Sequence, residues 1–158
     1  MKRIRFLLVC LLTLLIVPIA FAEEQSPFKK LLNTKTIKCY LDKGAAADWE
    51  KGKLNIEITK YSKSEESSYI TFGSIDIKNG KAKLIANVGS ADVTVLATAS
   101  GLSFIEETAS GNLSFTTIFP AQEKNTEKFL FVQSRHIYGL FGATPIPQQY
   151  YGTCEILE

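Results

Sequence analysis

Two cysteines near opposite ends of the chain constrain its fold more than any other feature. Cys39 and Cys154 are the only cysteines after residue 22, and 115 positions separate them. A disulfide between them requires Cα atoms within about 7 Å, so the first and last segments of the fold would have to lie side by side. The sequence has no C-x-x-C motif, which disfavours a redox-active pair. We therefore predict a structural disulfide, with two free reactive thiols as the alternative.

Residues 1–22 have the pattern of a secretory signal peptide. Basic residues at the N-terminus precede the apolar run 6–17, and an A-x-A cleavage motif ends at Ala22. The run has 12 residues, fewer than the roughly 20 that a membrane-spanning helix needs, and an uncleaved anchor is the alternative. Cys10 lies within the run rather than at its end, which disfavours a lipoprotein. We predict export to the periplasm or the exterior, with no membrane span after cleavage, and an oxidising compartment of this kind favours the disulfide.

Removal of the signal changes the charge balance. The full chain has 18 basic and 16 acidic residues, and three of the basic residues lie in the signal, which leaves a net charge of about −1. The remaining lysines are scattered instead of clustered, so nucleic acid is not expected as a partner. The rest of the chain is long enough for one domain with its own core. We predict an N-terminal segment over 23–33, where the spacing of apolar residues favours a short helix, and one domain over 34–158.

A period of two dominates the sequence from residue 34 onward, which is typical of strands with one buried face. Asn79-Gly80 has the composition of a two-residue hairpin turn. Residues 42–52, which hold the only tryptophan, break the alternation and indicate a long loop. About nine strands are expected, over 34–41, 54–59, 69–77, 82–88, 92–98, 102–108, 113–119, 128–137 and from 148 onward.

Short strands at this spacing, without a long helix, predict an all-β sandwich or barrel. Hairpin turns favour an up-and-down order, and a disulfide from the first strand to the last would bring the two edges of the sheet together. A single antiparallel barrel of about 8–9 strands satisfies both conditions and leaves no exposed edge, while a β-sandwich is the alternative. The barrel is lipocalin-like in architecture only, because no Gly-x-Trp motif stands near the first strand.

The strand over 128–137 combines aromatic residues with the only arginine after the signal. Phe129 and Phe131 share a face with Arg135, so Arg135 is predicted to face the interior, where its guanidinium could bind a ligand carboxylate. The same alternation in 102–108 places Glu106 inward. The alternative role for these two residues is a structural Glu106–Arg135 ion pair, because buried charges are nearly always paired.

These positions define a ligand-site hypothesis. We predict that the barrel binds a small apolar or amphipathic ligand, with Arg135 or Glu106 as the polar contact. The aromatic wall of the site would consist of Phe104, Phe115, Phe129 and Phe131. The alternative is a protein-interaction or inhibitor module of the cell envelope, in which side chains fill the barrel and the loops 42–52 and 138–147 contact the partner.

The sequence contains no recognisable catalytic or metal-binding motif. Ser134 and His136 stand two positions apart on one predicted strand, and no nucleophile elbow frames the serine. One histidine and a bonded cysteine pair leave zinc without enough ligands, and the acids of 42–50 do not have the spacing of a calcium loop. We therefore predict that the protein is not an enzyme and needs neither a cofactor nor a metal.

Several stretches of the sequence resemble a family of uncharacterised exported bacterial proteins. They lie at 101–108, 111–112, 116–119, 134–136 and 149–154. The resemblance covers most of the chain after the signal. It implies export from a bacterial cell and implies no activity.

Overall fold

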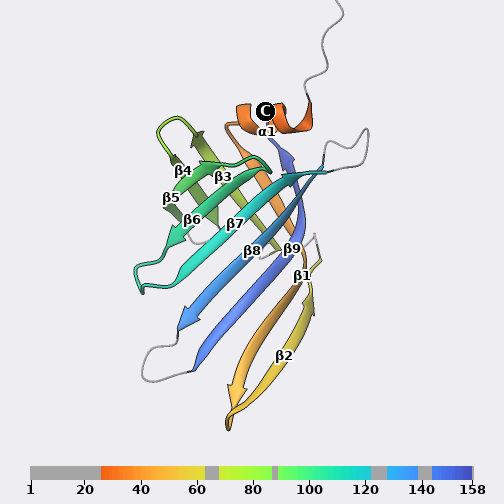
Figure 1. The fold of residues 1–158 in the computed structure, drawn as a ribbon, viewed down its shortest axis with the longest axis vertical. Helices are drawn as coiled ribbons and strands as arrows, with labels where there is room; N and C mark the ends of the chain where they lie inside the picture. Colours follow the sequence, from red (N-terminus) through yellow and green to blue (C-terminus); the bar gives the residue numbers. More distant parts are fainter. Residues whose placement is uncertain (1–25, 63–67, 87–88, 122–127, 139–143, 158) are drawn as a thin grey trace, which may run out of the picture.

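The computed structural model describes residues 26–62, 68–86, 89–121, 128–138 and 144–157. Within these ranges the chain forms one short helix and a 9-stranded antiparallel sheet (Figure 1). The elements are α1 (Pro27–Asn33), β1 (Ile37–Glu50), β2 (Lys53–Lys60), β3 (Tyr69–Asp76), β4 (Lys81–Ala86), β5 (Gly89–Ala97), β6 (Leu102–Glu107), β7 (Leu113–Pro120), β8 (Phe129–Tyr138) and β9 (Pro145–Ile156).

Eight of the strands close into a barrel. β1 pairs with β3, each strand from β3 to β8 pairs with the next one in the chain, and β9 pairs back with β1. β2 stays outside this ring because, within the described ranges, it pairs with β1 alone, from Lys43 to Glu50. The predicted antiparallel barrel is confirmed, with β2 as an extra strand at its side.

A disulfide joins β1 to β9 where the barrel closes, as predicted. Cys39 and Cys154 are opposite each other in the β1–β9 register, with 3.9 Å between their Cα atoms, and both are buried. Gly152 lets the strands approach here, because a Cβ at this position would overlap the carbonyl oxygen of Tyr40 and lie 2.6 Å from Cε1 of Phe131. The bond therefore links the first and last strands of a closed ring.

The prediction of a long loop over 42–52 is wrong. β1 runs through this range and a two-residue turn, Lys51-Gly52, leads directly into β2. The φ angles of the turn residues are 51° and 78°, as a tight hairpin turn requires. The alternation is hidden in the sequence because a bulge between Leu41 and Lys43 shifts the register of β1. Alanines then occupy both of its faces.

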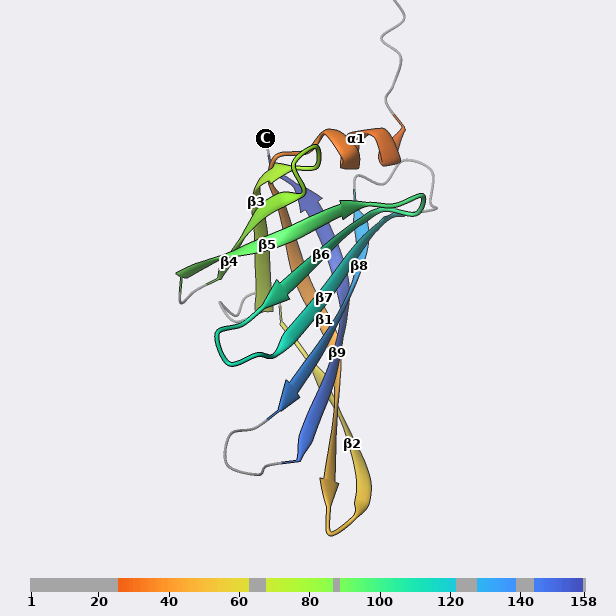
Figure 2. The same cartoon turned by 60° about the vertical axis from the view of Figure 1, so that its left-hand side comes forward.

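A short helix is present at the predicted place, and it covers one end of the barrel (Figures 1 and 2). Ser26 caps α1 by accepting a hydrogen bond from the Lys29 amide, and Pro27 occupies the first helical turn, where its missing N–H costs nothing. Leu31 points from the helix into the core and is fully buried. The described residues include no helix with the length and apolar character needed to cross a membrane.

Apolar side chains fill the barrel next to α1. Phe72 and Phe104 stack there with ring centroids 3.9 Å apart and an interplanar angle of 16°. The buried apolar residues are Leu31, Ile37, Cys39, Leu41, Phe72, Ile75, Ala82, Leu84, Val93, Val95, Leu102, Phe104, Ile118, Phe129, Phe131 and Cys154. They form one cluster to which every strand of the ring contributes.

Candidate ligand site at the far end of the barrel

The strand register arranges the inward side chains in rows that cross the barrel. Near α1 these rows are apolar, as in the row that contains Leu102, Ile118 and Phe131. Toward the opposite end, here called the far end, two polar rows pass through β7, β8 and β9, and beyond them the inward pair Ile137–Ile146 is apolar again. The interior therefore has an apolar half next to α1 and a largely polar half, where a ligand would find hydrogen-bonding groups.

Arg135 stands in the middle of one polar row, here called the Arg135 row. It pairs with Ser114 of β7 on one side and Gln148 of β9 on the other. From one side to the other the row consists of Glu106, Ser114, Arg135, Gln148, Ala46 and Glu57, contributed by β6, β7, β8, β9, β1 and β2. One cation thus lies between two carboxylates, with Glu106 two strands away on one side and Glu57 three strands away on the other.

The next row toward α1 is organised around Tyr150. Tyr61, which follows β2, packs edge-on against this ring, with 5.9 Å between the centroids and an interplanar angle of 63°. Gly44 leaves space for both rings, because a Cβ there would lie 2.8 Å from Cδ1 of Tyr150 and 3.2 Å from Cε2 of Tyr61. The Tyr150 hydroxyl donates a 2.6 Å hydrogen bond to Oε1 of Gln148, which connects this row to the Arg135 row.

Arg135 has no counter-ion in the described part of the chain. The ion pair found there joins Lys83 and Asp92 on the outer surface, with 2.6 Å between Nζ and Oδ1. No described residue makes an ion pair or a side-chain hydrogen bond with the Arg135 guanidinium, although its side chain is partly buried. The donors of this partly buried guanidinium are therefore available to an anion.

The pKa of Tyr61 is shifted by its burial and by its neighbours in the site. Burial raises this pKa above its ordinary value of 10.0, and Tyr150 adds to the increase. The positive charge of Arg135 acts in the opposite direction and lowers it. Arg135 therefore lies close enough to the Tyr61 hydroxyl to influence its ionisation, although β2 and β8 are not neighbours in the sheet.

Glu106 faces the interior in the same row as Arg135, as predicted, but the ion pair that was the alternative role for these two residues is not formed. Both side chains are partly buried, and Ser114 occupies the position between them in the row. Two strand spacings separate their backbones by roughly 9–10 Å. Glu106 therefore contributes negative potential at the side of the site and leaves the guanidinium available.

The predicted aromatic wall is mostly packed core. Phe104, Phe129 and Phe131 face inward, but they are only 1–3% exposed and belong to the packed core cluster, which leaves little of their surface for a ligand. Phe115 was predicted to face the interior, and this is wrong, since it lies on the outer face and is 46% exposed. The reason is that β7 turns its hydroxyl residues inward: Ser114 and Thr116 are buried opposite Arg135 and Gln133.

A hollow of about 310 Å³ adjoins the Arg135 row between β9 and the β1–β2 hairpin. It is lined by Ala46, Ala47, Asp48, Asn55, Ile56, Glu57 and Ile146. Asp48 is already engaged, because its Oδ1 accepts hydrogen bonds from the Trp49 amide and the Thr144 hydroxyl. The described residues contain no group of three or more metal-ligating side chains.

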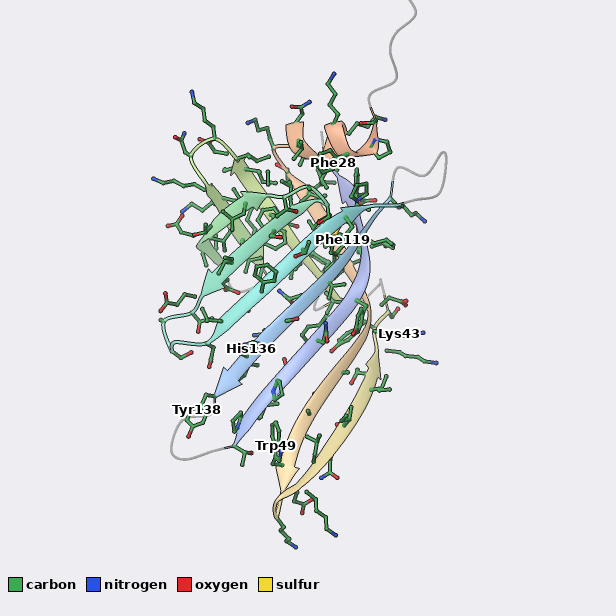
Figure 3. All side chains as sticks on the ribbon, viewed as in Figure 1. Phe28, Lys43, Trp49, Phe119, His136 and Tyr138 are labelled. Atoms are coloured by element: carbon green, nitrogen blue, oxygen red, sulfur yellow. A yellow bond between two sulfur atoms is a disulfide. The ribbon has the colours of Figure 1, made fainter. Side chains whose placement is uncertain are left out.

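His136 and Ser134 point to the outer face, opposite Leu113 and Phe115 of β7. Figure 3 shows His136 on β8 and Lys43 on β1, with the Lys43 side chain directed away from the sheet.

Sequence reasoning missed Tyr61 and Gln148 as parts of the site. Tyr61 lies in a segment that reads as a polar loop, and Gln148 becomes significant only when the β8–β9 register places it beside Arg135.

Comparison with known proteins adds no relative from which a role could be inferred. A scan against protein-family models finds no match to this chain, and searches of the curated proteins and of the solved structures find none either. The resemblance to exported bacterial proteins therefore stays a prediction, and the candidate site has to be interpreted from its own geometry.

Proposed function

We propose that the protein binds a small amphipathic ligand through an anionic group, with Arg135 as the residue that receives the anion. The observation that carries this proposal is the partly buried guanidinium without a counter-ion in the described part of the chain. Its planar set of donors matches a carboxylate in two parallel hydrogen bonds. The amide of Gln148 adds further donors in the same row, because its oxygen already accepts from Tyr150.

The apolar part of such a ligand would contact the rings at the border between the two halves of the barrel. Tyr61 and Tyr150 are partly buried and pack against the edge of the apolar core. Aromatic rings with a polar end suit this position, since the ring contacts hydrocarbon and the hydroxyl stays among polar groups. The filled half next to α1 limits the ligand to the far end of the barrel.

The proposal includes export. The disulfide of the barrel is stable in an oxidising compartment and would be rare in the cytosol. Together with the signal-like residues 1–22, it supports a protein that folds and binds its ligand in the periplasm or outside the cell.

The proposal is tested by titrating the oxidised protein, purified from an exporting host, with decanoate. The uncharged comparison is 1-decanol. Hydrogen bonds to a charged group contribute about 1.5–3 kcal/mol, so Arg135→Gln is expected to weaken decanoate binding by about 10- to 100-fold. Lys43→Gln, which removes an exposed cation from the outer face, should change it less than about twofold. Decanoate that binds the Arg135→Gln protein as tightly as the native protein would exclude this site.

A second function, binding to another protein, is favoured by one observation. The outer face of the β1–β2 hairpin is apolar and exposed, with Trp49, Leu54 and Ile56 at its surface. If the native protein binds neither decanoate nor 1-decanol, protein binding is favoured over ligand binding as its function.

A further inference from the structure

β2 forms one edge of the sheet and projects beyond the barrel. Within the described ranges it pairs with β1 alone, and every one of its residues is exposed. Leu54, Ile56 and Ile58 are 53%, 65% and 72% exposed and share the outer face. Figures 1 and 2 show the β1–β2 hairpin extending away from the ring of strands. Proteins usually protect such an edge, because it is a template for another strand.

The backbone of this edge is ready to form hydrogen bonds. Glu50 and Lys53 flank the two-residue Lys51-Gly52 turn and pair with each other, which makes them a hydrogen-bonded pair. Since the pattern alternates along antiparallel strands, Lys53, Asn55 and the other odd-numbered residues of β2 direct their N–H and C=O groups toward β1. The groups of Leu54, Ile56 and Ile58 point to the free edge, so the apolar residues also carry the free hydrogen-bonding groups.

The sequence of β2 is complementary to itself in one antiparallel register. With Ile56 opposite Ile56 of a second copy, Leu54 meets Ile58 and the apolar face continues across the junction. On the other face Asn55 meets Glu57, and Lys53 meets Thr59, so no like charges are opposite each other. The diagonal neighbours of Glu57 are Lys53 of the second copy, which is favourable, and Glu57 of the second copy, which is not, so the two contributions cancel.

Neighbouring registers are worse. A shift that centres the pair on Glu57 places two carboxylates opposite each other and sets Leu54 against Lys60. A shift that centres it on Asn55 moves Ile58 opposite Gly52 of the turn, where no strand remains to pair with. Lysines at both ends of β2 further restrict pairing. For pairing with a second copy, the edge therefore favours the register centred on Ile56 over its neighbours.

We propose that the protein forms a homodimer through antiparallel pairing of β2 with β2 of a second copy, with the two-fold axis at Ile56. The two sheets then continue into each other through the hairpins, and the ring of each barrel is unchanged. An interface limited to one strand and its side chains lies at the small end of specific interfaces, below about 1,200 Å². We therefore expect a weak dimer in concentration-dependent exchange with the monomer.

Sedimentation velocity of the oxidised protein between 1 and 500 µM, in steps of about threefold, tests this proposal. The sedimentation coefficient should rise with concentration from that of a monomer toward that of a dimer. Ile56→Lys and Ile56→Glu should each remain monomeric at all concentrations, because either substitution places two like charges opposite each other at the axis. An equimolar mixture of the two variants should dimerise again. Ile85→Lys, on the outer face of β4 and 45% exposed, is the matched control and should behave as the native protein.

Each other result overturns the proposal. A native protein that stays monomeric at 500 µM excludes the dimer. Dimers that survive Ile56→Lys, or that Ile85→Lys weakens equally, place the interface elsewhere. Single variants that are monomeric but do not dimerise when mixed exclude the two-fold axis at Ile56. A monomeric native protein that takes up a foreign extended peptide along β2, with loss of uptake in Ile56→Lys, would assign the edge to a different partner.

Discussion

The Cys39–Cys154 bond should be the largest single contribution of any side-chain pair to the stability of the barrel. It joins residues 115 positions apart, and the loss of chain entropy in the unfolded state grows with the length of the loop that is closed. The chain-entropy relation gives about 5 kcal/mol for a loop of this length. With a urea m-value of about 2 kcal/mol per molar, the midpoint of unfolding should fall by about 2.5 M on reduction.

Urea unfolding of the oxidised and the reduced protein measures this difference. The reduced sample is reduced in denaturant and refolded in the presence of a phosphine reductant. Unfolding is monitored by tryptophan fluorescence and far-UV circular dichroism. Reduction leaves both sulfur atoms in place, so it adds no cavity at these buried positions. The double variant Cys39→Ala and Cys154→Ala is the comparison in which no thiol can reoxidise. Because the unfolded states differ in compactness, extrapolated free energies are compared as well as midpoints. A difference below about 1 kcal/mol would refute the reasoning, because it would mean that β1 and β9 stay associated in the unfolded chain without the bond.

Two further predictions concern the core and the site. Phe104→Ala should destabilise the protein by about 3–5 kcal/mol, because it leaves a cavity against the stacked ring of Phe72. Phe115→Ala on the outer face should cost under about 1 kcal/mol. Equal losses of stability in urea unfolding would contradict the assignment of Phe104 to the inner face and Phe115 to the outer face. The raised pKa of Tyr61 stabilises the folded state below its ordinary value of 10.0, and this contribution is lost as the pH rises through the higher folded value. Since the charge of Arg135 lowers this pKa, Arg135→Gln should raise the pKa of Tyr61 further. Phenolate absorbance during a pH titration measures the change, and Tyr61→Phe assigns the signal. An unchanged titration would contradict the placement of Arg135 near Tyr61.

Much of the barrel could be predicted from the sequence because two features determine it: the alternation of apolar and polar residues, and the cysteine pair. Alternation marks strands wherever one face is buried and the other is not, and a pair of cysteines near the two ends leaves few ways to connect them. Residues 42–52 could not be predicted, because β2 and the end of β1 project from the barrel and have no buried face to impose a pattern. A bulge after Leu41 also changes the phase.

The interior could be predicted only in part for a related physical reason. In β8 the large apolar residues Phe129 and Phe131 face inward, and the assignment of Arg135 to the same side follows directly. In β7 the apolar residues Leu113 and Phe115 face outward, so the usual rule of hydrophobic residues inside gives the wrong face. Only the pairing with β8, which places Thr116 opposite Gln133 in the polar half, settles the orientation.

The ligand site and the free edge meet at Glu57. This residue lies at one side of the Arg135 row, where its negative charge opposes the binding of an anion. In the proposed dimer Glu57 faces an uncharged asparagine, and its two diagonal neighbours are Lys53 and Glu57 of the second copy, whose charges cancel. Dimerisation should therefore leave the potential around Arg135 nearly unchanged. Because coupling between two binding equilibria is reciprocal, a bound anionic ligand should likewise leave the dissociation constant of the dimer unchanged.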